Sequence, residues 1–329
     1  MVNSLLIDPR FKLQFAGHET FPLRYGWLKK SYDAVCLARL SGNTDTRTIF
    51  TDDSAIAYFG VGKNMVASMR YWAHAANILS QGDDDAGLLE PTDLGRMIFE
   101  KGGDPFLDDP ASLWLIHWHL ASTPNRTTTW YWAFNELYEP TFTRELLLHR
   151  LLRRLGELRE VGRLNESRLT EMTLKRDIEC FVRTYAARQE NSKVGQEDNL
   201  ESPLSELGLL QCVEGVPGFQ FRRGPKMSLP DEIFLYGLVR FWTELYPTRR
   251  EFTVEAVTHE PGSPGRVFLL DEESVVDRLV RLADLTDGVL RWDESTGMRQ
   301  VYAAKNLEQL DPMEYLARLY DRTAQRDAA

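Results

Sequence analysis

The feature that most constrains this chain is a glycine turn between two short helical patterns. Gly60-Val61-Gly62 follows residues 52–59, whose acidic first turn predicts a short helix. After the turn, apolar side chains recur at helical spacing over residues 63–79: Met65, Met69, Trp72, Ala76 and Leu79. Residues 88–99 come next and can supply a strand and a wing. Two helices joined by a tight turn and followed by a wing are the element order of a winged helix-turn-helix.

Patterns on both sides of this segment extend the prediction. Thr20 as a cap and Pro22 as an early helical residue predict the start of a preceding helix. Toward the C-terminus, helical patterns over 230–246 and 271–285 lead into a predicted hairpin over 289–304. The sequence therefore predicts a mainly α fold, built of two or three winged helix-turn-helix-like units with small β-hairpins.

The chain of 329 residues is long enough for two or three domains. We expect an N-terminal winged-helix DNA-binding domain with aromatic helical packing over 11–138. A basic helical linker or second helical unit is expected over 139–200, and a C-terminal winged-helix-like domain over 201–329. The polar segment 191–202 is predicted to be a surface loop or hinge.

Composition excludes several classes of protein. Hydrophobic residues are 43% and charged residues 27% of the chain, which excludes a disordered or fibrous protein. No stretch approaches the ~20 apolar residues of a membrane span, and we read no signal peptide. The three scattered cysteines, Cys36, Cys180 and Cys212, form no Cys-x-x-Cys pair, so neither a disulfide framework nor a zinc ribbon is predicted. We therefore expect a reduced, cytoplasmic protein that has no membrane partner.

The charge of the chain is acidic overall but unevenly distributed. A net charge of −10 and a pI near 5.2 would repel nucleic acid if the charge were uniform. Residues 24–80, however, carry seven Lys and Arg against four Asp and Glu, and residues 144–188 carry eleven against seven. The acidic total does not exclude DNA binding if these basic segments share a face. The alternative is that both segments are simply solvated helices.

The predicted helix after the glycine turn carries the clearest binding pattern. Lys63, Ala67, Arg70 and His74 fall on one stripe of residues 63–79. Basic and amide side chains with a small residue between them are suited to a DNA groove. The residues predicted to contact DNA are Lys63, Asn64, Ser68, Arg70, Tyr71 and His74. The alternative is a winged helix that contacts proteins or serves as a scaffold.

The turn itself is not a nucleotide-binding phosphate loop. Such a loop needs a glycine where this chain has Ala57, and a serine or threonine where it has Asn64. The better interpretation places Lys63 and Asn64 at a helix N-terminus, where a phosphate can meet a cation and free backbone N–H groups.

A polar loop between two phenylalanines offers candidate catalytic residues. His18, Glu19 and Arg24 could act as base, metal ligand and charge stabiliser in phosphodiester hydrolysis. They could equally form a buried hydrogen-bonded cluster that fixes the loop, and spacing alone favours that alternative. Recognisable nuclease signatures are missing, and no residue can be assigned as a metal ligand from spacing.

Two other groups are interpreted as structural. His117 and His119 lie two apart among apolar residues, so we expect core histidines rather than a metal pair. Asp83, Asp84 and Asp85 could hold a divalent cation, but three successive loop carboxylates usually face water.

Three long stretches carry a resemblance to a known family: FAGHETFPLRYGWLKK at 15–30, VGKNMVASMRYW at 61–72 and DPASLWLIHW at 109–118. They resemble a bacterial family catalogued as a domain of unknown function, whose genes lie beside DNA phosphorothioation genes. The resemblance covers roughly residues 11–305 and is greatest to the SspB-type members, which belong to single-strand phosphorothioation and phage-defence systems.

The resemblance implies a DNA nicking endonuclease, whose nick would open one strand so that sulfur can replace a non-bridging phosphate oxygen. It also implies partners, namely a cysteine desulfurase, an ATP-dependent sulfur-transfer enzyme and a P-loop ATPase. It assigns no catalytic residue in this sequence.

Three hypotheses follow. The first is a metal-assisted nickase that acts on double-stranded DNA, with Mg²⁺ or Mn²⁺ activating water. The second is a non-catalytic winged-helix DNA-binding adaptor that recruits the sulfur-transfer enzyme, which better explains the missing nuclease signature. The third is an assembly subunit whose winged helices contact proteins only. Each is compatible with a homo-oligomer.

Overall fold

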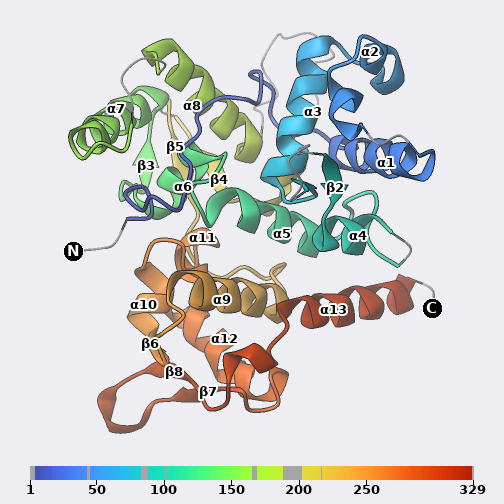
Figure 1. The fold of residues 1–329 in the computed structure, drawn as a ribbon. Coiled ribbons are helices and arrows are strands. Elements are labelled where there is room, and N and C mark those ends of the chain that lie inside the picture. The colour runs from blue at the N-terminus through green and yellow to red at the C-terminus, as the bar shows by residue number, and fades with distance from the viewer. Residues whose placement is uncertain are drawn as a thin grey trace.

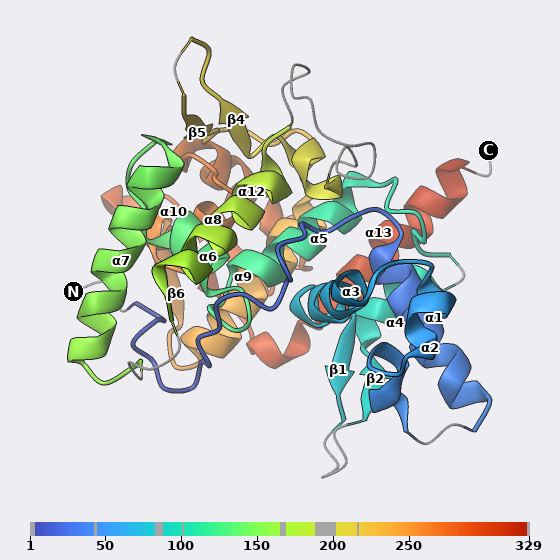
Figure 2. The same cartoon turned by 90° about the horizontal axis from the view of Figure 1, so that it is seen from above.

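The computed structural model describes residues 4–42, 45–82, 88–100, 102–164, 169–187, 202–215 and 217–327. Helices dominate these ranges and are joined by small antiparallel sheets, which confirms the prediction of a mainly α fold (Figure 1). Seen from above, α1–α4 gather on one side of the molecule and α7 and α8 on the other, with α5 between them (Figure 2). None of the described helices combines the length and the apolar character of a membrane span.

The N-terminal group of elements surrounds α3. Its members are α1 (Trp27–Leu40), η1 (Thr46–Phe50), α2 (Ser54–Phe59), α3 (Lys63–Ala75), β1 (Leu79–Gln81), β2 (Leu89–Pro91) and α4 (Asp93–Phe99). Gly60 ends α2 in the left-handed region at φ 68°, as the glycine turn predicted. Strands β1 and β2 pair antiparallel, with Leu79 opposite Pro91. Helix α3 packs against α1, α2 and β1, so only part of its surface reaches solvent.

The first helix begins later than the sequence predicted. It starts at Trp27 rather than near Pro22, and Gly26 precedes it at φ 75°. A helix from Pro22 would need the Phe21 carbonyl to accept a bond from residue 25. That carbonyl instead accepts the indole N–H of Trp72 at 3.0 Å. A tertiary hydrogen bond thus competes with the local capping signal.

The central helix is α5 (Pro110–Ala121), which packs against α6 (Thr128–Asn135), η3 (Pro203–Leu207) and α9 (Asp231–Leu245). Asp109 caps α5 by accepting the N–H of Ala111 at 2.8 Å, and Pro110 occupies the first turn. All residues of α5 from Ala111 to Ala121 are buried except His119, which is partly buried. An all-round apolar helix of this kind requires covering elements on every side.

A small sheet connects the middle of the chain to its second half. Helices α7 (Arg144–Glu160) and α8 (Glu171–Tyr185) follow β3 (Thr141–Phe142), which pairs with β5 (Phe219–Phe221) and through it with β4 (Leu210–Cys212). Phe142 lies opposite Phe219, and the two rings are 6.2 Å apart. The sheet therefore joins residues 141–142 to residues 210–221. Of the predicted loop 191–202, only Ser202 falls within the described residues.

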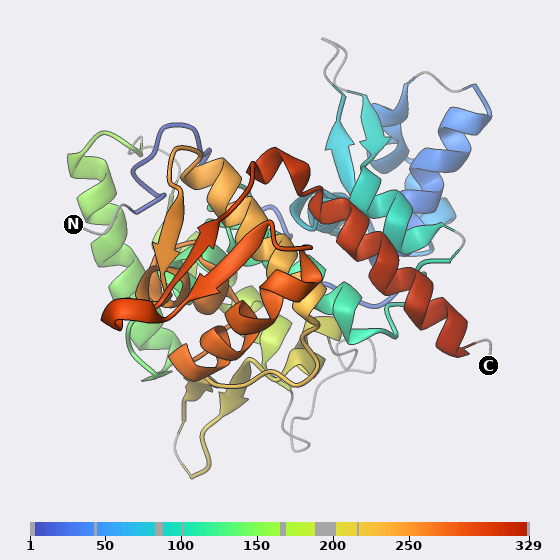
Figure 3. The same cartoon turned by 90° about the horizontal axis from the view of Figure 1, so that it is seen from below.

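The C-terminal elements form the lower layer in Figure 1. After α9 come β6 (Glu251–Thr253), α10 (Val254–His259), α11 (Pro264–Val267), α12 (Glu272–Leu285), β7 (Leu290–Asp293), η4 (Ser295–Gly297), β8 (Gln300–Ala303), η5 (Leu307–Gln309) and α13 (Pro312–Asp327). The predicted hairpin over 289–304 is confirmed as β7 and β8, and β6 completes the sheet on the other side of β8. Helix α13 packs along α9 and extends toward the N-terminal elements (Figure 3).

The contact between α5 and α9 gives a test of this packing. A Cβ at Gly237 would lie 2.8 Å from Cζ3 of Trp118 and 3.2 Å from Cε2 of Phe268. We expect Gly237→Ala to lower the free energy of unfolding by about 1–3 kcal/mol through overpacking, measured by urea denaturation. A Cβ at Gly156 of α7 would meet nothing within 4 Å. Gly156→Ala, the matched control, should be stabilising by roughly 0.5–1 kcal/mol. Equal midpoints for the two variants would contradict the close α5–α9 crossing.

Candidate nucleic-acid interface

The exposed side of α3 carries most of the residues predicted to contact DNA. Lys63, Asn64 and Ala67 are exposed, and Arg70 and His74 are partly exposed along the same stripe. Buried residues such as Val66, Met69 and Ala73 hold the opposite side in the core. The predicted stripe therefore reaches solvent at its basic positions.

Two of the six residues predicted to contact DNA are buried. Ser68 is 0% exposed and Tyr71 is 6% exposed. The Tyr71 hydroxyl donates to the backbone carbonyl of Arg126 at 2.9 Å, and the Tyr71 ring leaves no room for a Cβ at Gly17. The exposed stripe is narrower than the sequence predicted, because Ser68 is buried and Tyr71 packs against Gly17 and the α5–α6 loop.

An open pocket of about 780 Å³ lies at the start of α3. Its lining residues are Phe21, Arg24, Ile56, Gly60, Val61, Gly62, Lys63, Asn64 and Met65. Gly62 supplies no side chain to cap the helix, so the first N–H groups of α3 are open to a ligand. The guanidinium of Arg24 lies 5.5 Å from the Phe21 ring centroid and 5.4 Å from that of Trp27. The structure thus brings Arg24 together with Lys63 and Asn64, an arrangement that suits an anion.

A further arginine joins this surface from a distant part of the sequence. Arg126 lies in the loop between α5 and α6, with its backbone at φ 61°. Burial lowers the pKa of Arg126, and the positive charge of Arg70 lowers it further. Nothing in the local sequence around residue 126 signalled this role, because the juxtaposition depends on how the loop packs against Tyr71.

His74 lies beside both arginines and is uncharged at neutral pH. Burial, followed by the charges of Arg126 and Arg70, lowers the pKa of His74 to about 4. Its Nδ1 is 3.1 Å from the carbonyl oxygen of Leu79, which can only accept, so Nδ1 carries the proton of the neutral ring. His74 therefore adds no positive charge of its own to the stripe.

His18, a candidate catalytic base, is held in the core. Its side chain is 1% exposed and its ring packs among those of Tyr71, Trp72 and Trp130. Its Nε2 is 2.7 Å from Oδ1 of Asp177, and its Nδ1 accepts the backbone N–H of Thr20 at 3.1 Å. Since Nδ1 is an acceptor, Nε2 carries the proton, and this N–H donates a hydrogen bond to the carboxylate. Both ring nitrogens are thus engaged within the protein.

Asp177 completes this buried cluster and was missed by the sequence analysis. Its carboxylate also accepts the Ala16 N–H at 2.9 Å and the hydroxyl of Thr129. The cluster fixes a loop whose backbone lies in the left-handed region at Ala16, Gly17, Glu19 and Thr20. This geometry matches the alternative in which His18 positions the loop. Glu19, in contrast, is exposed.

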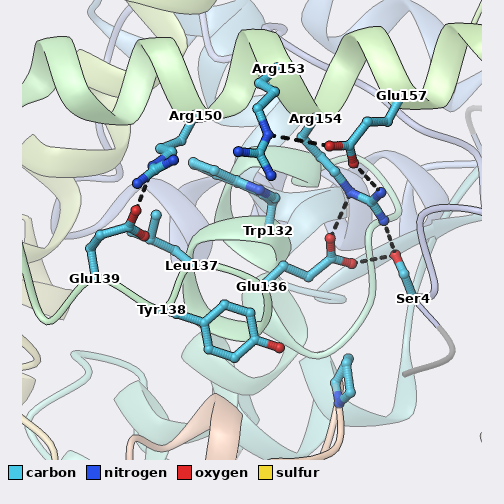
Figure 4. Close-up of a pocket in the computed structure, with 11 residues that line it drawn as sticks. Ser4, Trp132, Glu136, Leu137, Tyr138, Glu139, Arg150, Arg153, Arg154 and Glu157 are labelled. Atoms are coloured by element: carbon cyan, nitrogen blue, oxygen red, sulfur yellow. Dashed lines mark hydrogen bonds and ion pairs between the residues drawn. The ribbon is translucent and has the colours of Figure 1, made fainter. Parts of the chain in front are cut away.

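A second pocket, of about 420 Å³, lies beneath α7 and contains three arginines (Figure 4). Arg150 pairs with Glu139, and Arg154 pairs with Glu136 and Glu157. Burial raises the pKa of Glu136, which also accepts the hydroxyl of Ser4. Because these arginines already bind carboxylates, the pocket is an internal ion-pair network rather than a site for an external anion.

The two remaining histidine candidates lie in the core. His117 bonds to Tyr185 and the Val267 carbonyl, and His119 to Tyr236, so both are core histidines as predicted. Burial lowers the pKa of His117 to about 4 and that of His119 to about 3. Asp83, Asp84 and Asp85 lie outside the described residues. Among the residues that are described, no group of three or more His, Cys, Asp or Glu could hold a metal ion.

Comparison with known proteins supports the resemblance carried by the three sequence stretches. The model of a family described as protein of unknown function (DUF4007) matches residues 15–320. The chain belongs to this family. It is similar to the crystal structure of magnesium ion-bound SspB, with a TM-score of 0.81, 29% identity, and coverage of 97% of this chain and 91% of that one. A second SspB crystal structure has a TM-score of 0.79 with the same identity and coverage. No curated protein matches the sequence.

The buried cluster generates a prediction about stability. Asp177→Ala should lower the free energy of unfolding by roughly 2–4 kcal/mol, because two buried donors and one partly buried donor lose their acceptor and each unsatisfied group is costly. Glu179→Ala is the matched control on α8, since Glu179 is partly exposed and pairs with Arg144 at 2.5 Å. The control should change stability by less than about 1 kcal/mol. Urea denaturation checks both, and equal effects would contradict a structural role for the His18–Asp177 pair.

Proposed function

We propose that this chain binds double-stranded DNA through the exposed side of α3, as a component of a DNA phosphorothioation and phage-defence system. The observation that carries the proposal is the charge on that side. Within the described residues, Lys63, Arg70 and Arg126 form no ion pair, so their charges are available to an external anion. The relationship to SspB supports the biological context.

The arrangement of α1–α3 with β1 and β2 favours a winged helix-turn-helix mode of binding. The glycine turn separates α2 from α3, which would be the recognition helix. Lys63 and Asn64 at its N-terminus can contact a phosphate with side chains and backbone N–H groups, which positions the protein on DNA. The C-terminal group α9–β8 has a similar element order and is proposed to be a second unit of this type.

Within this proposal, the activity implied by the family resemblance is nicking of one strand. A similar structure is magnesium-bound SspB, which supports Mg²⁺ or Mn²⁺ as the metal. The described residues do not form a preformed metal cage, so no chemical step is assigned to the metal. Of the candidate catalytic residues, Glu19 is exposed and Arg24 borders the pocket beside Lys63, whereas His18 would act by holding the loop.

The second candidate is a DNA-binding adaptor without catalysis. The burial of His18, whose two ring nitrogens are both engaged within the protein, favours it. In this case the chain would deliver the sulfur-transfer enzyme to DNA. The cysteine desulfurase and the P-loop ATPase are proposed partners of either activity.

DNA binding is tested by neutralising the exposed stripe. Lys63→Gln with Arg70→Gln should weaken binding of a duplex about tenfold or more and lower the salt slope by about two, because two phosphate contacts are lost. Arg96→Gln is the control, since Arg96 is exposed but pairs with Asp93 at 2.9 Å. Fluorescence anisotropy over a salt series measures both quantities. Unchanged affinity in the double variant would show that α3 does not face DNA.

Nicking is tested with supercoiled plasmid. We expect open-circular product with Mg²⁺ or Mn²⁺, none with EDTA, and none from a Glu19→Ala variant that still binds DNA. His18→Ala should lose stability and binding together, because it removes a buried partner of Asp177. DNA binding with no nicking in either Mg²⁺ or Mn²⁺ would support the adaptor and contradict the nickase.

A further inference from the structure

We propose that Arg70 and Arg126 form a clamp for a single backbone phosphate of DNA. The inference rests on the proposed DNA-binding function and deepens it by assigning one discrete phosphodiester site. The two side chains come from different elements, α3 and the α5–α6 loop. Two guanidinium groups that converge from separate elements can bind different oxygens of one phosphate.

The loop that carries Arg126 is braced at several points. Its Asn125 side chain accepts the Lys12 N–H at 2.8 Å, and its Asn125 carbonyl accepts the Thr127 N–H at 2.7 Å. The Thr128 hydroxyl donates to the Pro124 carbonyl at 2.8 Å. The bond from Tyr71 to the Arg126 carbonyl then fixes the loop against α3. The root of the Arg126 side chain is therefore held against α3, next in sequence to Arg70 at Tyr71, before any ligand arrives.

The positive charges of Arg70 and Arg126 are not neutralised by a neighbouring carboxylate of the described residues. Neither guanidinium has a hydrogen-bond or ion-pair partner in the part of the chain that the structure describes. Arg126 is partly buried, and its pKa is lowered first by burial and further by the positive charge of Arg70. The arginines beneath α7 show the contrasting case, because carboxylates neutralise them. An anion between Arg70 and Arg126 would relieve their repulsion.

The position on α3 identifies the anion as a DNA phosphate. Lys63 lies two turns before Arg70 on the same stripe, about 10 Å along the helix axis. The clamp and Lys63 would therefore contact different phosphates of one duplex. A lone metabolite phosphate would gain nothing from this continuation of the basic stripe.

His74 reports on occupancy of the clamp. The groups that face it are Arg70 on α3, Arg126 on the loop and the Leu79 carbonyl on β1. Because the arginine charges lower the pKa of His74, a bound phosphate would offset them and raise it. This signal does not depend on DNA binding elsewhere on the molecule.

The clamp is tested in the full chain by double substitution. Arg70→Gln and Arg126→Gln should each weaken duplex binding about tenfold, and the double variant should bind about as weakly as either single one. The salt slope of the double variant should fall by about one in total, because one phosphate contact is lost. Additive losses, or a fall of about two, would show two separate contacts and overturn the clamp. Arg126→Lys should keep most of the slope but not the affinity.

Two controls separate this inference from the proposed function. If Lys63→Gln weakens binding while the arginine variants do not, α3 binds DNA and the clamp is wrong. If the wild-type chain binds no DNA, inorganic phosphate is the probe, and NMR follows the His74 titration. A phosphate-dependent rise in the pKa of His74 that disappears in Arg126→Gln supports the clamp as a phosphate site and overturns DNA as its ligand. No rise in the wild type, or the same rise in the variant, overturns it.

Discussion

The burial of α5 is the constraint on which the rest of the structure depends. A helix that is apolar on every side must be covered on every side, and α6, η3 and α9, from the middle and C-terminal parts of the chain, pack on it. Its polar side chains then need partners inside the protein. Ser112 bonds to Tyr320 of α13 at 2.8 Å, and His117 connects α8 to α11 through Tyr185 and the Val267 carbonyl. These bonds determine which elements can cover α5.

The same core positions the candidate interface. Helix α6 packs on α5, and the ring of Trp130 from α6 lies 5.6 Å from that of Trp72 on α3. The His18–Asp177–Thr129 cluster adds a polar connection between the N-terminal loop, α8 and α6. The exposed side of α3 is therefore held by an aromatic and hydrogen-bonded base. Rigid support of this kind keeps basic side chains in register with a ligand.

Periodicity predicted the parts of the fold that local sequence determines. The spacing of Met65, Met69 and Trp72 predicted α3, and two strand-like stretches that flank the turn segment 294–298 predicted β7 and β8. It could not give the start of α1, because a tertiary bond from Trp72 takes the carbonyl that a longer helix would use. Periodicity also could not give the width of the exposed stripe, because helical spacing does not show that other parts of the chain cover Ser68 and Tyr71.

The candidate site was likewise predictable only where its residues share one helix, as Arg70 and His74 do. Arg126 and Asp177 reach the region through tertiary packing, which a single sequence does not contain.

The overall charge of −10 is compatible with a basic contact surface, because the net charge affects the approach to DNA and the local charge acts at contact. At physiological ionic strength the Debye length is about 8 Å, so exposed acidic residues farther away than this are largely screened. The acidic total therefore affects approach to DNA more than contact with it. At contact, the charges nearest the DNA determine binding. Lys63, Arg70 and Arg126 have no carboxylate partner within the described residues. Net charge thus poorly describes a protein that pairs the arginines beneath α7 with carboxylates and gives Arg70 and Arg126 no carboxylate partner among the described residues.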